Sequence, residues 1–311
     1  MPGRLTFQCG LSQEVFRMKA TFLDDRGVVQ VSGDDARKFL NGLFTTDVSK
    51  LHPGEARFGA LLTPQGKIIV DFLVTQVPAS NGGERFLLDV PRALAQALTD
   101  KLNVYKLRAK VAVSNLSDQL GVIAVGDGAV GATPEPSFTD PRHESLGARV
   151  IASQGALQDI AGGLGAEVVT ADAYEAHRID CAVPRGGLDF MYGDAFPHET
   201  NMDRLHGVDI GKGCYVGQEV VSRMHHRGTT RTRTAKVLLD GPSPEPGTPI
   251  LAGEKSVGTM GSASQQKGMA LLRIDRATEA MEAGTPLTAG GLTLRVADLE
   301  ALQGAPKQTV A

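Results

Sequence analysis

Short apolar segments separated by Gly, Pro or Asp fill the first 115 residues of the chain. Within them apolar residues alternate with polar ones or form brief unbroken runs, which is typical of β-strands. The segments that we expect to be strands are residues 28–31, 60–62, 68–75, 86–90 and 110–115. Two stretches have apolar residues at helical spacing, and they predict helices over residues 34–44 and from Pro91 to about residue 102. The second helix is expected to bury Ala93, Leu94, Ala97, Leu98 and Leu102.

The middle of the chain continues this mixture of strands and helices. Residues 122–125 and 149–152 predict further strands, and residues 154–162 and 171–181 predict helices. Strands and helices do not alternate regularly along the sequence. This irregular order favours an α+β fold over a doubly wound parallel sheet.

The pattern changes at residues 240–247, which contain three prolines and two glycines. No regular element is expected to cross such a cluster. Beyond it, short strand-like runs at residues 257–260, 269–274, 286–287 and 292–297 alternate with Gly-rich turns, and they predict a small all-β barrel. We therefore expect three parts, namely an α+β part over residues 1–118, a second α+β part over 119–228 and a β-barrel over 229–311.

Composition narrows the class of protein. A chain of 311 residues can bury a sizeable core and divide into two or three domains. Its three cysteines, Cys9, Cys181 and Cys214, are too few and too scattered for a disulfide framework. No apolar run approaches the length of a membrane span, and residues 1–19 lack the apolar core of a signal peptide. We expect a protein of a reducing, soluble compartment with a disordered N-terminus, a weak transit peptide being the alternative.

Charge gives one local signal. The formal net charge of −3 supplies no global electrostatic reason to bind nucleic acid or a membrane surface. Residues 220–239, however, contain no acid, and their basic residues and histidines are Arg223, His225, His226, Arg227, Arg231, Arg233 and Lys236. This basic stretch is either a solvated face or an anion site, for example for the glutamate tail of a folate or for a nucleic-acid backbone.

The densest chemistry lies in residues 212–223. The motif positions there are Lys212, Gly213, Cys214, Tyr215, Gly217, Gln218, Glu219 and Arg223. The glycines allow a tight turn, and apolar residues at helical spacing after it predict that the turn leads into a helix. Cys214 would then precede a helix N-terminus, whose partial positive charge, together with Lys212, would lower the thiol pKa and favour the thiolate. The alternative is a buried structural cysteine in a glycine turn.

Four further polar residues have structural and functional interpretations. Glu219 and Arg223 are four residues apart on the predicted helix, so an ion pair is a sufficient structural explanation for both. Gln218 could present its amide to a pterin ring, which offers a matched donor and acceptor edge. Asp71 stands inside an apolar run, where a buried and unpaired acid would be costly, so it either faces solvent or has a partner.

The motif resembles the signature of the YgfZ/IBA57 family, folate-binding-like proteins of iron–sulfur cluster maturation that are related to the glycine-cleavage aminomethyltransferase. That signature is Lys-Gly-Cys-aromatic-x-Gly-Gln-Glu followed closely by Arg, and residues 212–223 fill every position. Residues 197–203 are similar to the family's Pro-x-Glu-x-Asn segment, and Arg178 stands where a helix-borne Arg is expected. Residues 31–67 look like the family's opening strand, helix and hairpin. The resemblance covers the chain from about Thr21 to its end.

The resemblance implies an aminomethyltransferase-like folate-binding module of two interleaved α+β parts, followed by a C-terminal barrel. It also implies tetrahydrofolate or a derivative as the ligand, and Cys214 as an essential thiol tuned by Lys212. The residues expected to bind the folate are Asp71, Glu199, Asn201, Gln218 and Arg223. The chain departs from the family pattern at Cys181 and at His198.

Two other patterns are weaker. Residues 126–131 spell a Gly-x-Gly-x-x-Gly dinucleotide fingerprint, but Pro134 and Pro136 exclude the helix that would hold the pyrophosphate, so we expect a loop. No Cys-x-x-Cys or His-Glu-x-x-His spacing occurs, so the chain alone is not expected to bind a metal. Cys214 with a histidine of the basic stretch could ligate a cluster shared with a second protein, whereas Cys181 is expected to be a small core residue.

We therefore expect an accessory protein for iron–sulfur cluster assembly or repair rather than an enzyme, with cluster assembly proteins or client enzymes as partners. Its expected location is the bacterial cytoplasm, or the mitochondrial matrix in a eukaryote. Two alternatives are kept. One is a tetrahydrofolate-dependent aminomethyltransferase, which shares the folate-binding module. The other is an RNA-associated accessory protein, for example in tRNA modification, which would use the basic stretch.

Overall fold

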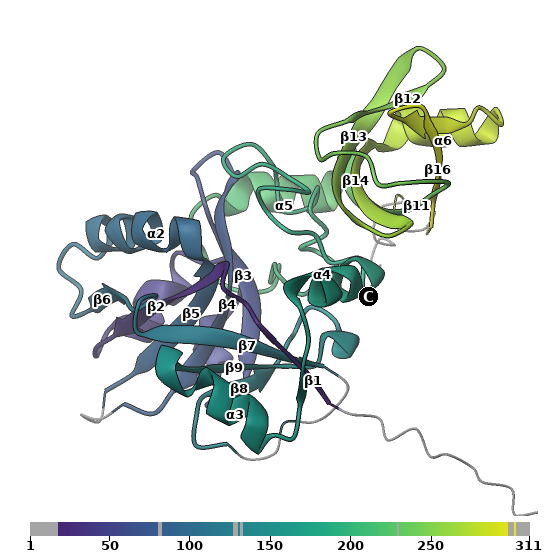
Figure 1. Cartoon of the computed structure of the whole chain (residues 1–311). Helices are drawn as coiled ribbons and strands as arrows, with labels where there is room; N and C mark the ends of the chain where they lie inside the picture. The colour runs from purple at the N-terminus through teal and green to yellow at the C-terminus, as the bar shows by residue number, and fades with distance from the viewer. Residues whose placement is uncertain are drawn as a thin grey trace, which may run out of the picture.

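The computed structural model describes residues 18–302 except residues 80–82, 127–129, 131–132, 229 and 298–301. Two five-stranded sheets with flanking helices are followed by a closed six-stranded barrel (Figure 1). This is the α+β module with a C-terminal barrel that the sequence predicts. Cys9 and most of the fingerprint-like segment 126–131 lie outside the described residues.

The first sheet is antiparallel, with the strand order β3-β4-β5-β2-β6. Its strands are β2 (Arg26–Ser32), β3 (Ala56–Leu62), β4 (Ile68–Val77), β5 (Arg85–Pro91) and β6 (Ala112–Asn115). Helices α1 (Ala36–Asn41) and α2 (Arg92–Tyr105) cover one face of the sheet, and the short 3₁₀ helix η1 (Val48–Lys50) follows α1. All five strands predicted for this region are confirmed.

The two helices differ in detail from their predictions. Helix α1 ends at Asn41, and Phe44 leaves the helix to form a β-bridge with Leu61, so the predicted helix over residues 34–44 was too long. Helix α2 buries Leu98 and Leu102 as expected, together with Ala95 and Thr99. The prediction that Ala93 and Ala97 are buried was wrong, because the helix is rotated so that both face solvent.

The second sheet has the order β10-β1-β7-β9-β8. Its strands are β1 (Lys19–Phe22), β7 (Leu120–Gly126), β8 (Ser137–Thr139), β9 (Ala148–Ser153) and β10 (Glu167–Val168). The 3₁₀ helices η2 (Glu144–Leu146) and η3 (Gln154–Ala156) flank β9, and α3 (Leu157–Gly163) covers the outer face. Strand β1 comes from the N-terminal part of the chain, so the two parts of the module are interleaved.

The inner faces of the two sheets pack against each other, which gives the layer order helices, sheet, sheet, helix. Strand β7 shows why its sequence is an unbroken apolar run, since successive side chains of a strand point to opposite faces. Val122 and Ala124 contact the core between the sheets, whereas Ile123 and Val125 contact the core beneath α3. Both faces of β7 are therefore buried.

The barrel closes in the order β11-β14-β13-β12-β15-β16. Its strands are β11 (Thr232–Leu239), β12 (Pro249–Ala252), β13 (Lys255–Ser264), β14 (Lys267–Arg273), β15 (Leu287–Ala289) and β16 (Leu292–Val296). Strand β11 precedes the proline-rich segment 240–247, so that segment is a loop within the barrel. The prediction of an all-β barrel was wrong in one respect, because α6 (Ile274–Glu282) packs Ala277 and Ala280 into the barrel core.

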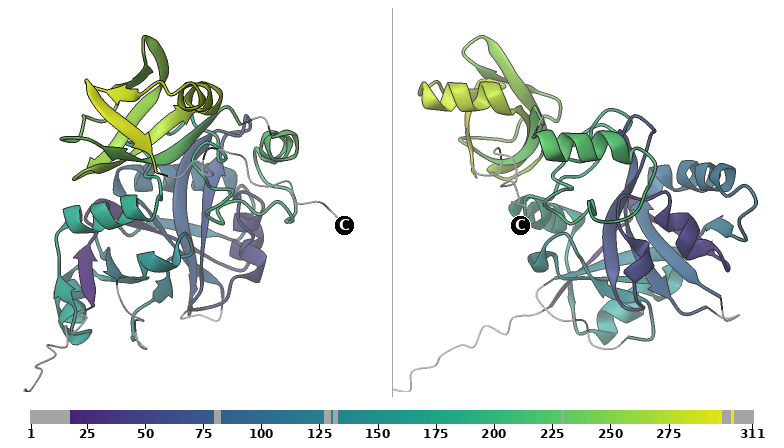
Figure 2. Two further views of the ribbon diagram at one scale, coloured as in Figure 1. Left: turned by 90° about the vertical axis from the view of Figure 1, so that its right-hand side faces the viewer. Right: turned by 180° about the vertical axis from the view of Figure 1, so that it is seen from behind.

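Helices α4 (Ala171–Asp180) and α5 (Gln218–Arg227) lie on the side of the module that faces the barrel (Figures 1 and 2). Helix α4 contacts β13 and β14 directly. In the part of the chain that the structure describes, no helix is long and apolar enough to cross a membrane.

Candidate functional site

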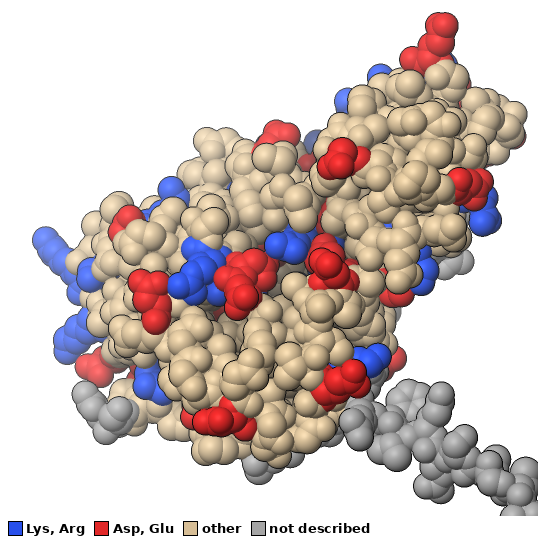
Figure 3. Space-filling model, in the orientation of Figure 1, with Lys and Arg blue, Asp and Glu red and all other residues tan. Residues whose placement is uncertain are grey.

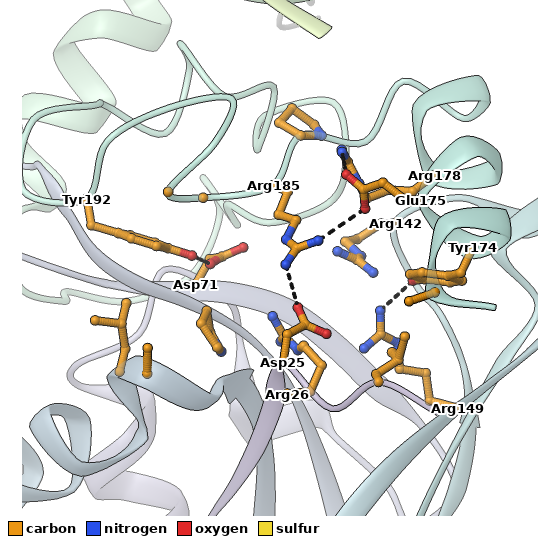
Figure 4. Close-up of a pocket in the computed structure, with 18 residues that line it drawn as sticks. Asp25, Arg26, Asp71, Arg142, Arg149, Tyr174, Glu175, Arg178, Arg185 and Tyr192 are labelled. Carbon is orange, nitrogen blue, oxygen red and sulfur yellow. Dashed lines mark hydrogen bonds and ion pairs between the residues drawn. The ribbon is translucent and has the colours of Figure 1, made fainter. Parts of the chain in front are cut away.

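A cavity of about 330 Å³ lies where β2, β4 and β9 approach the N-terminal ends of α2 and α4. Its wall contains five arginines and three acids. The charged and tyrosine lining residues are Asp25, Arg26, Asp71, Arg142, Arg149, Tyr174, Glu175, Arg178, Arg185 and Tyr192 (Figure 4). Across the middle of the face shown in Figure 3, basic and acidic side chains stand next to one another in a band below the barrel.

Asp71 lies in this cavity wall. It shares the inner face of β4 with Leu73, and its side chain is buried. The Tyr192 hydroxyl donates to Asp71 Oδ1 at 2.5 Å, which leaves Oδ2 for a donor on a ligand. Burial and the charge of Asp71 raise the pKa of Tyr192, so the hydroxyl keeps its proton. The sequence argument that Asp71 is either exposed or partnered is confirmed, because Tyr192 is the partner.

Buried ion pairs form the floor of the cavity. Arg149 donates to Asp89 at 2.5 Å and to Asp140 at 3.3 Å. Arg142 donates twice to Asp140, at 2.9 and 2.6 Å, and Arg26 donates to Asp89 at 2.5 Å. Burial alone would raise the pKa of Asp140, but the charges of Arg142 and Arg149 outweigh it and lower the pKa. Three guanidinium groups share two carboxylates, so the floor itself carries one excess positive charge, which the acids of the cavity wall offset.

Arg178 joins the cavity wall to the barrel. It projects from α4 and is buried, as expected for the helix-borne Arg. Its guanidinium donates to Asp189 at 3.0 Å, to the Ser262 hydroxyl of β13 at 2.5 Å and to Glu175 at 3.1 Å. Arg178 is thus held from three sides and has a structural role.

Arg185 lies at the rim. Its side chain is 39% exposed, against 14% or less for the other four cavity arginines. It bridges Glu175 at 3.3 Å and Asp25 at 3.0 Å (Figure 4). Ion pairs this exposed are weak, so Arg185 can exchange an acid for the carboxylate of a ligand.

Glu199 and Asn201 lie at the junction with the barrel and do not line this cavity. The Glu199 carboxylate accepts from Phe196 N at 2.8 Å, and its carbonyl accepts from Thr234 N at 2.8 Å. Asn201 Nδ2 donates to Thr234 O at 2.9 Å, and Asn201 Oδ1 accepts from Arg233 at 3.0 Å. Both residues hold β11 against the module.

Gln218 and Arg223 lie on α5, and they do not line the cavity either. Arg223 is exposed and donates to Glu219 at 2.7 Å, so the predicted i,i+4 ion pair is confirmed. Of the five predicted folate ligands, the structure therefore places Asp71 alone in the cavity wall. The sequence interpretation missed the arginine floor, although Arg149 also interrupts an apolar strand.

Lys212 is buried and anchors the motif segment. Its ammonium donates to three backbone carbonyls at and after the C-terminal end of α1, those of Asn41 at 2.7 Å, Phe44 at 2.6 Å and Thr46 at 2.9 Å. Burial lowers the pKa of Lys212 to about 8, although Asp47 and Asp209 act in the opposite direction. An ammonium has three protons, so this group has no donor left for the Cys214 thiol.

The other end of the segment is anchored by Tyr215 and Gly217. The Tyr215 ring is buried and lies 5.1 Å from the Lys212 ammonium. Gly217 has φ of 81°, and a Cβ there would lie 2.6 Å from Thr63 O and 3.1 Å from Gly66 Cα. Only glycine allows this approach of the α5 N-terminus to the β3–β4 turn.

Cys214 is exposed between these anchors. A Cβ at its neighbour Gly213 would meet no heavy atom within 4 Å, so this side of the loop is open. The alternative of a buried structural cysteine is wrong for Cys214. Cys181 is half-buried, and burial raises the pKa of its thiol. In the described ranges, no group of three or more His, Cys, Asp or Glu residues is arranged to hold a metal ion.

Known protein families match both the N-terminal part of this chain and its C-terminal barrel. The GCVT N-terminal domain family matches residues 16–128, and the CAF17 C-terminal β-barrel domain family matches residues 231–302. The mitochondrial iron–sulfur cluster assembly factor IBA57 of Mus musculus is 30% identical over 281 residues, which cover 81% of this chain and 76% of that protein. The chain belongs to the IBA57 family. The resemblance carried by residues 212–223 is thereby confirmed.

Other IBA57 relatives are longer than the matched region. The Mycosarcoma maydis homologue is 38% identical over 219 residues, which cover 67% of this chain and 54% of that protein, so the chain spans about half of that relative. The glycine cleavage system aminomethyltransferase T from Bartonella henselae matches with a TM-score of 0.73 over 91% of this chain and 86% of that chain. Its 16% identity shows a shared fold and nothing further.

The basic stretch of this IBA57 family member does not form one surface. Arg233 is buried and pairs with Asp203 at 3.0 Å. Lys236 donates to Asp180 O at 2.8 Å, and Arg223 pairs with Glu219. The cations are therefore divided between the junction of β11 with the module, the contact with α4 and the surface of α5.

His198, one of the two departures from the family pattern, is buried beside α5. In the described part of the structure, neither ring nitrogen has a hydrogen-bond partner, and the ring centroid lies 5.8 Å from that of His225. Burial lowers the pKa of His198 to about 4, with Arg233 and His225 acting in the same direction and Asp203 opposing them.

We expect His198 to make the fold acid-sensitive. The pKa is near 6.5 in the unfolded chain and about 4 in the folded protein, so the unfolded state binds more protons between these values. The free energy of unfolding should therefore fall as pH decreases from 6.5 through 4, by about 3 kcal/mol at pH 4. Urea unfolding of wild type and His198→Leu at pH 7 and pH 4 measures this loss. An unchanged dependence in His198→Leu would contradict the assignment.

Proposed function

We propose that this protein is an accessory factor for iron–sulfur cluster assembly or repair that presents Cys214 to a partner. The names of its IBA57 relatives describe that role for them. The observation that carries the proposal is the construction of the motif segment. Two buried residues, Lys212 and Tyr215, flank an exposed thiol.

Such a thiol suits exchange with a second protein, because ligand or disulfide exchange requires access to the sulfur. Iron–sulfur clusters commonly have four sulfur ligands from protein, and Cys214 can supply one of them. A partner would supply the others, and the cluster would be cargo rather than a resident group. Cluster assembly proteins and client enzymes are the partners that fit this role.

Deletion of the gene tests the role. Several cluster-dependent enzymes should lose activity in the deletion strain, while enzymes without clusters keep theirs, and the wild-type gene should restore the lost activities. Unchanged cluster-enzyme activities in the deletion strain would refute the proposed function.

We propose further that the cavity binds a reduced folate, which carries one-carbon units when bound. Asp71 Oδ2 can accept from the N–H groups of the pterin ring, and Arg185 with the arginine floor can bind the glutamate carboxylates. The residues of this chain would bind and orient the ligand. Glu199 and Asn201 would act only indirectly, by holding the barrel.

Asp71→Asn should weaken tetrahydrofolate binding by about tenfold to a hundredfold, because a hydrogen bond to a charged acceptor contributes about 1.5–3 kcal/mol. Isothermal calorimetry under anaerobic conditions measures the change. Gln218→Ala is the matched control and should bind as wild type does, since Gln218 lies on α5 outside the cavity. Absence of wild-type binding at high micromolar ligand would remove the folate site, and equal affinity in Asp71→Asn would remove this residue from it.

The aminomethyltransferase alternative shares the fold but lacks support from the motif. Incubation with an aminomethylated lipoyl carrier and tetrahydrofolate distinguishes the two functions, because only the transferase would form methylene-tetrahydrofolate. The RNA-associated alternative is disfavoured by the division of the basic stretch. Steep salt dependence of RNA binding would support it.

The location proposed for the protein follows its relatives. The matched fungal and mammalian IBA57 proteins are named as mitochondrial. We place this protein in the mitochondrial matrix if its source is eukaryotic, and in the cytoplasm if it is bacterial.

A further inference from the structure

The C-terminal end of α2 and the loop after it expose two large aliphatic side chains. Val104 is 69% exposed and Leu107 is 87% exposed, whereas the opposite side of the helix buries Leu98 and Leu102. A single exposed aliphatic residue is ordinary on a protein surface. Here two lie three residues apart at the same end of α2, and neither belongs to a core cluster of the fold.

Leu107 is held in a strained backbone conformation. Its φ of 44° lies in the left-handed region, which costs a non-glycine residue about 1–2 kcal/mol. The loop is nevertheless fixed, because Ala109 N donates to Lys106 O at 2.7 Å and a Cβ at Gly33 would lie 2.1 Å from Lys110 O. These contacts hold the loop on both sides of Leu107, and strain of this kind is concentrated at functional surfaces.

Cations surround the aliphatic pair. Residues 101–117 contain no acid, and their basic residues are Lys101, Lys106, Arg108 and Lys110. Exposed Asp100 lies just before this stretch, four residues before Val104, and offsets one of these charges. Exposed Asp34 lies 4.0 Å from the Lys110 ammonium and offsets another. The last turn of α2 contains no basic residue, Lys106 is the C-cap, and Arg108 and Lys110 lie beyond the helix. At the left edge of Figure 3, where Figure 1 places this end of α2, basic side chains project from the surface.

The outer face of α2 connects this end with the cavity. Ala93 and Ala97 are exposed and lie at helical spacing with Val104, and exposed Asp100 lies between Ala97 and Val104 on the same face. Ala93 and Leu94 also belong to the cavity wall. At 1.5 Å per residue, Ala93 and Val104 are about 16 Å apart along the axis. A segment lying on this face would therefore extend from the exposed pair to the wall of the cavity.

We propose that this surface docks an acidic amphipathic segment of a partner protein. The α2 tip is defined by Lys101, Val104, Lys106, Leu107, Arg108 and Lys110. An apolar centre with a charged rim is the usual anatomy of a protein interface, and the cations require an acidic complement. Two aliphatic side chains are too few to anchor a membrane-bound face. Single-stranded nucleic acid would require aromatic platforms, which the exposed centre lacks.

Photo-crosslinking identifies the segment that binds there. A benzophenone amino acid replaces Ala97, which is exposed beside the α2 tip but not part of it, and crosslinking is done in cells of the source organism. Mass spectrometry gives the captured protein and the crosslinked residue. That protein is then purified and titrated by calorimetry into the full chain without cluster or folate, so the result is independent of the role of Cys214.

We expect the crosslink to lie in an acidic segment, and binding to weaken at least tenfold in Leu107→Asp and in the double variant Lys106→Glu, Arg108→Glu. Leu107→Gly removes the side chain and relieves the left-handed backbone, so it should lose binding while its thermal stability stays equal or rises. Binding of the full chain is also measured to two other probes in place of the captured protein. These are phosphatidylcholine vesicles with one quarter phosphatidylglycerol, and a 20-nucleotide single-stranded RNA. No specific crosslink, binding unchanged in the variants, or tip-dependent binding to vesicles or RNA would each overturn the proposal.

Discussion

Replacement of Cys214 by alanine is expected to abolish rescue of cluster-dependent enzyme activity in the deletion strain, while the protein remains folded and equally abundant. The side chain is exposed, so its loss removes few packing contacts. The segment is held on either side by the bonds of Lys212 and by the packing of Tyr215 and Gly217, none of which involves the thiol. Circular dichroism and thermal unfolding should therefore match those of the wild type.

Cys181→Ala is the control for this prediction and should rescue normally. Burial raises the pKa of the Cys181 thiol, and a raised pKa lowers the thiolate fraction that reacts. Iodoacetamide at neutral pH should accordingly label Cys214 before Cys181, as peptide mass spectrometry can measure. If Cys214→Ala rescues as well as the wild type at equal abundance, the thiol has no role in cluster maturation.

The sheets could be predicted from sequence because their central strands are buried on both faces. A strand such as β7 is an apolar run bounded by breakers, and this pattern is visible without tertiary information. The edge strand β10 has only two residues, so its pairing with β1 depends on tertiary contacts rather than on local pattern. Helix α6 was missed because the Gly-rich turns around it suggested strands throughout the barrel.

The candidate site was only partly predictable. A charged residue in an apolar run signals a buried partner, and this argument found Asp71. The same argument applies to Asp89 in β5 and Arg149 in β9, and it would have found the ion pairs of the cavity floor. The argument cannot tell a ligand-binding polar residue from one that binds another part of the chain. Glu199 and Asn201 have polar groups suited to a ligand, but those groups bind β11.

The role of Lys212 shows a second limit of prediction from sequence. Its position two residues before Cys214 suggested that its charge tunes the thiol. The hydrogen bonds of the ammonium go to carbonyls more than 160 residues earlier in the chain, at the end of α1. Proximity in sequence does not determine the direction of a long side chain in a turn, and no local pattern identifies acceptors so distant. Lys212 thus helps to fix the position of the loop that carries Cys214.

The largest loss of stability is expected from Asp189→Ala. The Asp189 carboxylate is buried and accepts from Arg178 at 3.0 Å, from Arg185 N at 2.7 Å and from both Ser262 N and Ser262 Oγ at 2.7 Å. A Cβ at Gly261 would lie 2.4 Å from Asp189 Oδ1, so the barrel approaches this carboxylate with no space for another residue. Asp189 is therefore the point at which α4, its following loop and β13 are joined.

Removal of that carboxylate would leave the buried Arg178 guanidinium short of an acceptor and the Ser262 amide without a partner. Loss of one member of a buried charge pair costs about 3–5 kcal/mol, and urea unfolding should show a decrease of this size. The barrel should also separate more readily, which limited proteolysis would detect as faster cleavage between α5 and β11. Asp194→Ala is the matched control. Its side chain is 89% exposed and pairs with Lys67 at 3.6 Å, so its removal should cost less than about 1 kcal/mol. Equal losses in the two variants would mean that Asp189 does not join the module to the barrel.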